Sequence, residues 1–254
     1  MVTDLQKASL WKRMSAGLFD LILLAMLAVG AAALLSWLFG YNTHNQSLRE
    51  AYSRYEAEYG VTFQITQEAF DAMTAEQQEA YDTAYQALIS DPDVIYRYNL
   101  VLNMTLLITT FGILISVLLL EFLVPLLLKN GQTLGKKIFG VALMRTDGVK
   151  LSSVQLFIRT VLGKFTIEIM IPVYILLMVF FNTIGIIAVA VLGAILVGEL
   201  LSLVLSKTNS LIHDSIAGTV AVDMASQMIF DTPDAKVAYI KRLHAEQAAR
   251  QEYK

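Results

Sequence analysis

The sequence predicts an all-α membrane protein, a polytopic bundle of about four transmembrane helices with a small external helical insert. Of its 254 residues, 56% are hydrophobic and only 16% are charged. A mean hydropathy of +0.57 does not suit a water-soluble surface. Several apolar runs also reach the roughly 20 residues that a helix needs to cross a hydrocarbon core of about 30 Å.

Four segments fit transmembrane helices, at about residues 14–39, 100–128, 165–181 and 184–205. Lys12 and Arg13 precede the first run as in a signal peptide, but a run of about 25 residues exceeds the roughly 7–15 of a signal sequence. An uncleaved anchor is the better interpretation, and cleavage near Gly30 is the alternative. The third segment could start as early as Val154. Only residues 182–183 separate it from the fourth, so these two form a hairpin.

The basic residues of the two long loops predict the orientation. Residues 40–99 contain three basic and ten acidic residues, whereas residues 129–164 contain seven basic residues and one acid. The positive-inside rule then places the first loop outside and the second loop, with both termini, in the cytoplasm. The predicted parts are 1–40, N-terminus and first transmembrane helix; 41–99, external insert; 100–128, second transmembrane helix; 129–164, cytoplasmic basic loop; 165–205, transmembrane hairpin; and 206–254, cytoplasmic tail.

The external insert contains two predicted helices. Tyrosines recur on one face of residues 52–59, and Gly60 would end that helix. Thr74 and Gln77 form a capping box at the start of the second helix, which Pro92 would stop. We expect the tyrosines to form the core of the insert or to lie at the membrane interface. The alternative is a cap that binds a ligand or partner.

The basic loop has only a superficial similarity to a phosphate-binding loop. Asn130 replaces the first glycine of that motif and Lys137 replaces its hydroxyl residue, so we exclude nucleotide binding. Residues 138–146 favour β structure and an Asp-Gly turn pair follows, which predicts a short hairpin or extended excursion at the membrane surface. We expect Lys136 and Lys137 to contact anionic lipid head groups.

The acids within the spans, Asp20, Glu121, Glu168 and Glu199, are the candidate ion or proton site. At 1.5 Å per residue each lies roughly 6–11 Å from the cytoplasmic boundary, so the four share one layer. A carboxylate that faces lipid costs about 2.5–3.5 kcal/mol, so these should face one another, basic partners or a water-filled vestibule. Glu121 and Glu199 have no basic residue within one helical turn and are the stronger candidates for reversible protonation.

Basic partners are close in sequence. Arg13 lies two helical turns from Asp20 on the same face, too far for direct contact unless the arginine reaches inward. Arg159, Lys164 and Glu168 form a ladder on the third helix, with Lys164 and Glu168 four residues apart. Three interpretations stay open: a ring of salt bridges needed only for folding, an ion or proton site, and a polar groove for a partner.

His213 and Asp214 follow the fourth span. They are too few for a metal site, and no serine motif accompanies them, so we expect them to cap and anchor a helix end. The chain contains no cysteine. We predict no metal, no cofactor, no catalytic residue and no enzymatic activity.

Three motifs resemble the RDD family of prokaryotic membrane proteins. They are residues 13–20, the Gly-Gln-Thr-Leu-Gly-Lys-Lys run of residues 131–137, and the His-Asp-x-x-Ala-Gly-Thr run that begins at His213. The arginine and two aspartates of the family name would be Arg13, Asp20 and Asp214. Ser215 replaces the usual basic residue, and the insert 41–99 lies outside the common pattern.

The resemblance implies a transport-related function, because ligand transport and cation/proton exchange are ascribed to members of the family. We expect movement of a cation or small solute, coupled to carboxylate protonation, in the inner (cytoplasmic) membrane of a prokaryote. Other members resemble regulators, so the alternative is a non-enzymatic adaptor that regulates a partner membrane protein. Expected contacts are the lipid bilayer and either such a partner or a second copy of the chain. A net charge of −3 argues against nucleic acid.

Overall fold

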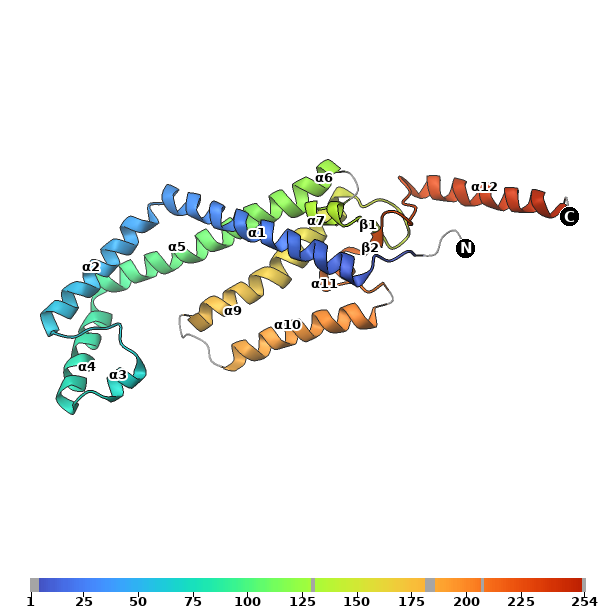
Figure 1. The fold of residues 1–254 in the computed structure, drawn as a ribbon. Helices are drawn as coiled ribbons and strands as arrows, with labels where there is room; N and C mark the ends of the chain where they lie inside the picture. Colours follow the sequence, from blue (N-terminus) through green and yellow to red (C-terminus); the bar gives the residue numbers. More distant parts are fainter. Residues whose placement is uncertain (1–4, 129–130, 181–185, 207, 253–254) are drawn as a thin grey trace. The chain divides into compact units, whose positions relative to one another are not determined.

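The computed structural model describes residues 5–128, 131–180, 186–206 and 208–252 (Figure 1). It divides into two compact units, of which the first combines Met1–Ala28 with Leu114–Lys254 and the second is Val29–Ile113. Helices dominate both units, so the predicted all-α class is confirmed. Helices α1 (Leu10–Leu38) and α5 (Pro92–Val117) contribute residues to both units.

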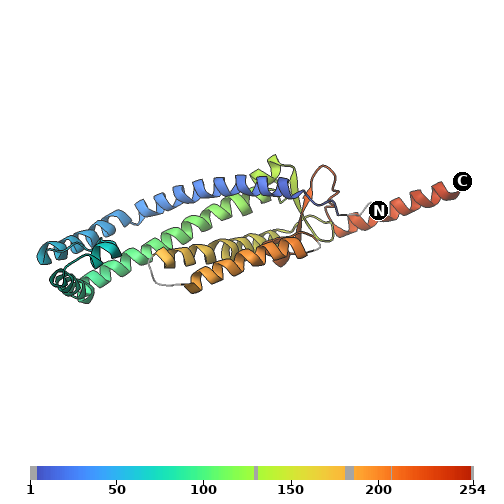
Figure 2. The ribbon, with the colours of Figure 1, turned by 60° about the horizontal axis from the view of Figure 1, so that its bottom comes forward.

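Three helical stretches of the described residues are long and apolar enough to cross a membrane: Leu10–Leu38, Pro92–Leu128 and Ser153–Met178. A shorter apolar helix, Ala190–Leu205, lies within α10 (Ile186–Leu205) at the fourth predicted span. The second stretch begins earlier than the predicted residue 100, because proline suits the first turn of a helix. The predicted turn at residues 182–183 lies outside the described residues. Figure 2 shows α9 (Ile171–Phe180) beside α10, which it contacts.

The second unit contains the predicted helical insert. Gly60, with φ +65°, ends α2, and the capping box of Thr74 and Gln77 opens α4, as predicted. Tyr52 and Tyr55 pack against the buried side chains of this unit, so they belong to its core. The helices of this insert are α2 (Tyr41–Tyr59), α3 (Gln67–Asp71) and α4 (Ala75–Ser90).

A two-stranded antiparallel sheet forms the core of the first unit beyond the membrane-spanning helices. Strand β1 (Val141–Arg145) pairs with β2 (Thr219–Asp223), so the local hairpin, one of the two predicted alternatives, is wrong. After the Asp-Gly turn, Val149 forms a bridge with Phe230, and Ser152 then caps the next helix, α8 (Ser153–Phe157). Both faces of the sheet are buried, which favours pairing with the apolar segment that precedes Asp223.

Two π-helical segments interrupt the membrane-spanning helices. The segment η1 (Leu118–Leu123) lies between α5 and α6 (Val124–Leu128), and η2 (Ile158–Met170) lies between α8 and α9. Hydrogen bonds from i to i+5 bring residues four and five apart onto one face of a π-helix. Arg159, Lys164 and Glu168 have these spacings, so η2 presents them together. An α-helix would turn Arg159 and Glu168, nine residues apart, to opposite faces.

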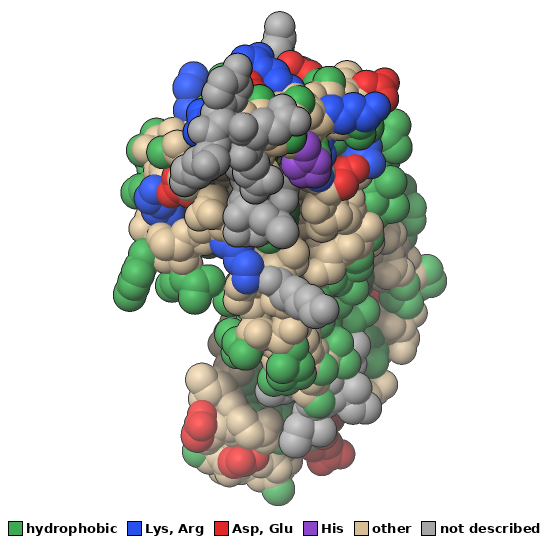
Figure 3. Space-filling model, turned by 90° about the vertical axis from the view of Figure 1, so that its right-hand side faces the viewer, with side chains coloured by type: hydrophobic (Ala, Val, Ile, Leu, Met, Phe, Trp, Pro, Cys, Tyr) green, Lys and Arg blue, Asp and Glu red, His purple; other side chains and the backbone are tan. Residues whose placement is uncertain are grey.

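The chain ends in α12 (Pro233–Glu252), a polar and mostly exposed helix. Figure 3 views the molecule from the side on which α12 lies in Figure 1. Lys and Arg side chains alternate there with Asp and Glu side chains. The described side chains of this face therefore carry both signs of charge.

Gly163 allows η2 to pack directly against the short helix α11 (Ile212–Ala217). A Cβ atom at Gly163 would lie 2.6 Å from His213 Cβ and 2.7 Å from His213 Cα. No real contact is that short, so any larger residue must push α11 away from η2. The position of His213 and Asp214 in the molecule therefore depends on this glycine.

We predict that Gly163→Ala lowers the stability of the folded chain by about 1–3 kcal/mol or more, because it overpacks the contact with α11. Thermal unfolding of the purified protein in detergent measures the effect. Gly193→Ala in α10 is the matched control, since nothing lies within 4 Å of the added Cβ. Equal melting temperatures for the two variants would contradict the close packing of η2 and α11.

Candidate functional site

Asp20 connects α1 to the loop that follows the second span. This carboxylate, only 5% exposed, accepts hydrogen bonds from the Thr133 hydroxyl and from the Gly135 N–H, at 2.8 Å for the latter. Thr133 also caps the short helix α7 (Leu134–Ile138). A Cβ at Gly135 would meet the Ala16 carbonyl oxygen at 2.3 Å, so only glycine allows this approach. Asp20 therefore holds α7 against α1.

Asp214 lies at the centre of a second set of contacts, on α11. Its Oδ1 accepts hydrogen bonds from Arg159 Nε at 2.8 Å and from the Thr219 hydroxyl at 3.0 Å. Arg13 Nη2 lies 3.8 Å from its Oδ2, and Arg13 also donates to the Asn209 carbonyl oxygen. Burial alone would raise the pKa of Asp214, but the charge of Arg159 holds that pKa well below its usual range. Asp214 is therefore an anion that joins α1, η2, α11 and β2.

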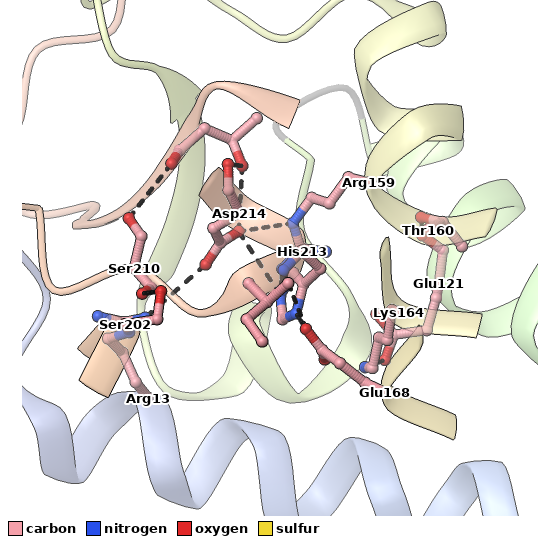
Figure 4. Close-up of polar contacts among 12 residues, drawn as sticks. Arg13, Glu121, Arg159, Thr160, Lys164, Glu168, Ser202, Ser210, His213 and Asp214 are labelled. Atoms are coloured by element: carbon pink, nitrogen blue, oxygen red, sulfur yellow. Dashed lines mark hydrogen bonds and ion pairs between the residues drawn. The ribbon is translucent and has the colours of Figure 1, made fainter. Parts of the chain in front are cut away.

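The contacts of His213 fix its protonation state. Arg159 Nη2, which can only donate, lies 2.7 Å from His213 Nε2, so Nε2 must accept (Figure 4). The opposite nitrogen, Nδ1, then carries the proton and lies 2.6 Å from Glu168 Oε1. Burial and the charge of Arg159 lower the pKa of His213, in agreement with this geometry. His213 is therefore a neutral imidazole that links Arg159 to Glu168.

Glu121 pairs with Lys164 across the two π-helical segments. Lys164 Nζ bonds to Glu121 Oε1, and the Thr160 hydroxyl donates to the Glu121 carbonyl oxygen at 3.0 Å. Lys164 and Glu168 lie on one face of η2, but Lys164 bonds to Glu121 and Glu168 contacts His213, so the predicted pairing of Lys164 with Glu168 is wrong. No basic residue lies within one helical turn of Glu121, as expected from the sequence, and its basic partner comes from a distant part of the sequence. Its second oxygen, Oε2, is buried without a hydrogen bond to the described residues.

Glu168 and Glu199 form a pair of carboxylates at the start of α11. Their side chains interact with each other. Glu168 Oε1 accepts from the His213 N–H at 2.9 Å, and Glu199 Oε2 accepts from the Ile212 N–H at 3.2 Å. Glu199 Oε1 is buried, and no donor among the described residues reaches it. Two acids from different helices thus share the N-terminus of α11.

A cavity of about 300 Å³ lies inside the first unit, next to these contacts. Apolar side chains from α1 and η2, including Leu21, Leu24 and Ile169, form part of its wall. The ionisable residues that line it are Arg13, Asp20, Lys136, Arg159, Lys164, Glu168, His213 and Asp214. The layer of acids predicted from the sequence is therefore part of one buried cluster, which we call the charge cluster: these eight residues with Glu121 and Glu199.

Other expectations are confirmed or corrected. Arg13 and Asp20 do not contact each other, as their spacing predicts, because each holds a different segment against α1. Lys136 lies inside the unit near Asp20, with its side chain 12% exposed, and so does not lie at the lipid surface. Lys137 is exposed, and its contact with head groups stays a prediction. His213 and Asp214 do more than cap a helix, since both are buried in the charge cluster.

Several contributors were missed by sequence reasoning. Thr133 and Thr160 bond to Asp20 and to the Glu121 backbone, and Gly135 and Gly163 permit the close approaches. The Gly-Gln-Thr-Leu-Gly motif of residues 131–135 gave a signal for Thr133 and Gly135. Among the described residues, no group of three or more His, Cys, Asp or Glu side chains is arranged to hold a metal ion.

These features define a class of protein, an integral membrane protein with a buried charge cluster between apolar helices. The chain belongs to the RDD family, whose family model matches residues 7–218. Arg13, Asp20 and Asp214, which the resemblance assigns to the family name, all lie in the charge cluster. No curated protein and no solved structure matches the chain.

We predict that Arg13→Gln and Asp20→Asn destabilise the chain additively, to within about 0.5 kcal/mol, because the two side chains share no partner. Arg159→Gln and Asp214→Asn form the reference pair and should show strong coupling, since these side chains bond directly. Unfolding free energies of the single and double variants in detergent give both coupling energies. If the coupling energy of Arg13 with Asp20 is as large as that of the reference pair, the two side chains do not have separate roles.

Proposed function

We propose that this membrane protein moves a cation or small solute across the bilayer, coupled to protonation of carboxylates in the charge cluster. The proposal includes no enzymatic step and no cofactor. Ionisable residues within membrane-spanning segments are expensive to bury and mark ion and proton pathways in many transporters. The charge cluster lies around a cavity and between apolar helices, where such a pathway requires its polar groups.

The pair of Glu168 and Glu199 is the observation that best supports the proposal. Two carboxylates in contact repel strongly when both are ionised, so the pair favours binding of one proton or one small cation. His213 does not compete for this proton, because its Nε2 accepts from Arg159. Glu199 Oε1 accepts no hydrogen bond from the described residues, so such a charge can bind there.

Glu199→Gln tests the coupling with little effect on folding. The amide oxygen can still accept from the Ile212 N–H and the amide nitrogen can donate to Glu168, but the side chain no longer binds a proton. We predict that this variant abolishes pH-dependent flux in reconstituted vesicles. The measurement is dissipation of an imposed pH gradient after addition of Na⁺ or K⁺ between pH 6 and pH 9.

Glu246→Gln in the exposed helix α12 is the matched control and should leave flux unchanged. If the wild-type vesicles show no flux of Na⁺, K⁺ or H⁺ above empty vesicles, cation transport by the pair is wrong. Loss of a membrane-protein partner on deletion of residues 41–91 would then support the adaptor function.

We further propose that both termini and β1 face the cytoplasm of a prokaryotic cell. The acidic second unit and the basic residues near β1 support this orientation through the positive-inside rule. The chain has no cysteine, so single cysteines at Ser53 and Thr146 provide specific labels. We predict that the first reacts with an impermeant maleimide in intact cells and the second only after permeabilisation. The opposite pattern would reverse the orientation.

A further inference from the structure

The cations around the cavity differ from the acids in how well they are satisfied. Both oxygens of Asp20 accept hydrogen bonds, from the Gly135 N–H and from the Thr133 hydroxyl. Glu168 accepts from the backbone and ring nitrogens of His213. Asp214 accepts from Arg159 and Thr219. The acids of the cavity wall are therefore occupied by donors of the protein itself.

Lys136 is the least satisfied of the cations. An ammonium has three N–H donors, yet its one hydrogen bond to the described residues is to the Thr133 hydroxyl at 3.3 Å. The nearest oxygen of Asp20 lies 3.9 Å away, which is an ion-pair distance and too long for a hydrogen bond. Burial lowers the pKa of Lys136 to about 8, so the side chain stays mostly charged at neutral pH.

Arg13 has spare donors on the same cavity. Its Nη1 bonds to the Asn209 carbonyl oxygen, but Nη2 reaches Asp214 only at 3.8 Å. A guanidinium carries five N–H groups, so several of them have no acceptor among the described residues. Buried donors of charged groups are costly when they lack acceptors. Among the residues that line the cavity, Lys136 and Arg13 therefore have spare hydrogen-bond donors. The two glutamate oxygens that are buried without a donor among the described residues belong to side chains outside this lining.

We propose that the cavity binds a small anion that carries a carboxylate or phosphate group, held by Lys136 and Arg13. The volume of about 300 Å³ is about ten times the roughly 30 Å³ of a water molecule, so it admits such a group with a short apolar portion against Leu21 and Leu24. The anion is either free in solution or the head group of an acidic lipid. The proposal goes beyond transport and does not rest on it, because binding is measured at equilibrium.

Equilibrium binding of inorganic phosphate and of acetate to the full chain tests the site, by calorimetry in neutral detergent at pH 7 and constant ionic strength. We expect saturable binding of at least one of these anions. Lys136→Gln should weaken it about ten- to a hundredfold, because it removes a charged donor. Lys137→Gln, the same change at the exposed neighbouring residue, should leave the affinity unchanged.

Gly17→Leu provides a second variant that leaves every charge in place. Gly17 lines the cavity and no atom lies within 4 Å of an added Cβ, so leucine adds bulk at the cavity wall without a steric clash. We expect it to block binding without lowering the melting temperature. If Lys136→Gln fails to fold, this variant still tests the location of the site.

Nanodiscs distinguish the two sources of the anion. Phosphatidylglycerol in place of phosphatidylcholine should weaken phosphate binding to the wild-type chain if a head group occupies the cavity, and should have no effect if the anion is free. The proposal is overturned if two results occur together. Neither phosphate nor acetate binds, and phosphatidylglycerol stabilises the wild-type chain no more than it stabilises the Lys136→Gln variant. It is also overturned if Lys137→Gln weakens binding as much as Lys136→Gln. Loss of flux with retained anion binding would refute the transport proposal alone.

Discussion

The contact between Arg159 and Asp214 is the constraint on which the first unit depends. Both side chains are almost fully buried, at 3% and 2% exposure, so each charge is tolerable only in the presence of the other. Replacing one partner of such a pair costs about 3–5 kcal/mol, whereas a well-packed apolar pair can be equally stable. The pair therefore determines where α11 and β2 lie more than it adds to the stability of the fold. It holds α11 against η2, and through Thr219 it fixes the start of β2.

The π-helical form of η2 is what makes this contact compatible with the others. Arg159, Lys164 and Glu168 must all point toward one side of the helix to reach Asp214, Glu121 and His213, and their spacing allows this only with i to i+5 hydrogen bonds. π-helical turns frequently occur at functional sites. Gly163, on the same segment, removes the side chain that would separate η2 from α11. Local sequence and long-range contacts thus select the same irregular geometry.

Sequence reasoning succeeded where the physics is local or periodic. Apolar runs predicted the long helices, Gly60 predicted the end of α2, and Thr74 predicted the start of α4, because each depends on neighbouring residues. The common layer of acids also followed from helix geometry. The partners of individual residues and strands were predicted badly. The partner of Lys164 was assigned by α-helical spacing, and the partner of β1 was sought in the neighbouring sequence. Those pairings depend on residues that are distant along the chain, and on a helix type that the hydrophobic pattern does not encode.

The carboxylates of the charge cluster differ in how completely their oxygens are hydrogen-bonded. Asp20 and Asp214, which the resemblance assigns to the family name, accept hydrogen bonds from protein donors and hold α7 and α11 in place. Glu121 and Glu199 each retain one buried oxygen without a donor among the described residues. A group whose contacts are complete cannot change its charge without breaking the fold, whereas one with a free oxygen can take up a proton or cation at little structural cost. The two aspartates therefore hold the wall of the cavity in place, and Glu121 is held by Lys164. Under the proposed function, Glu199 is the group that takes up the proton or cation.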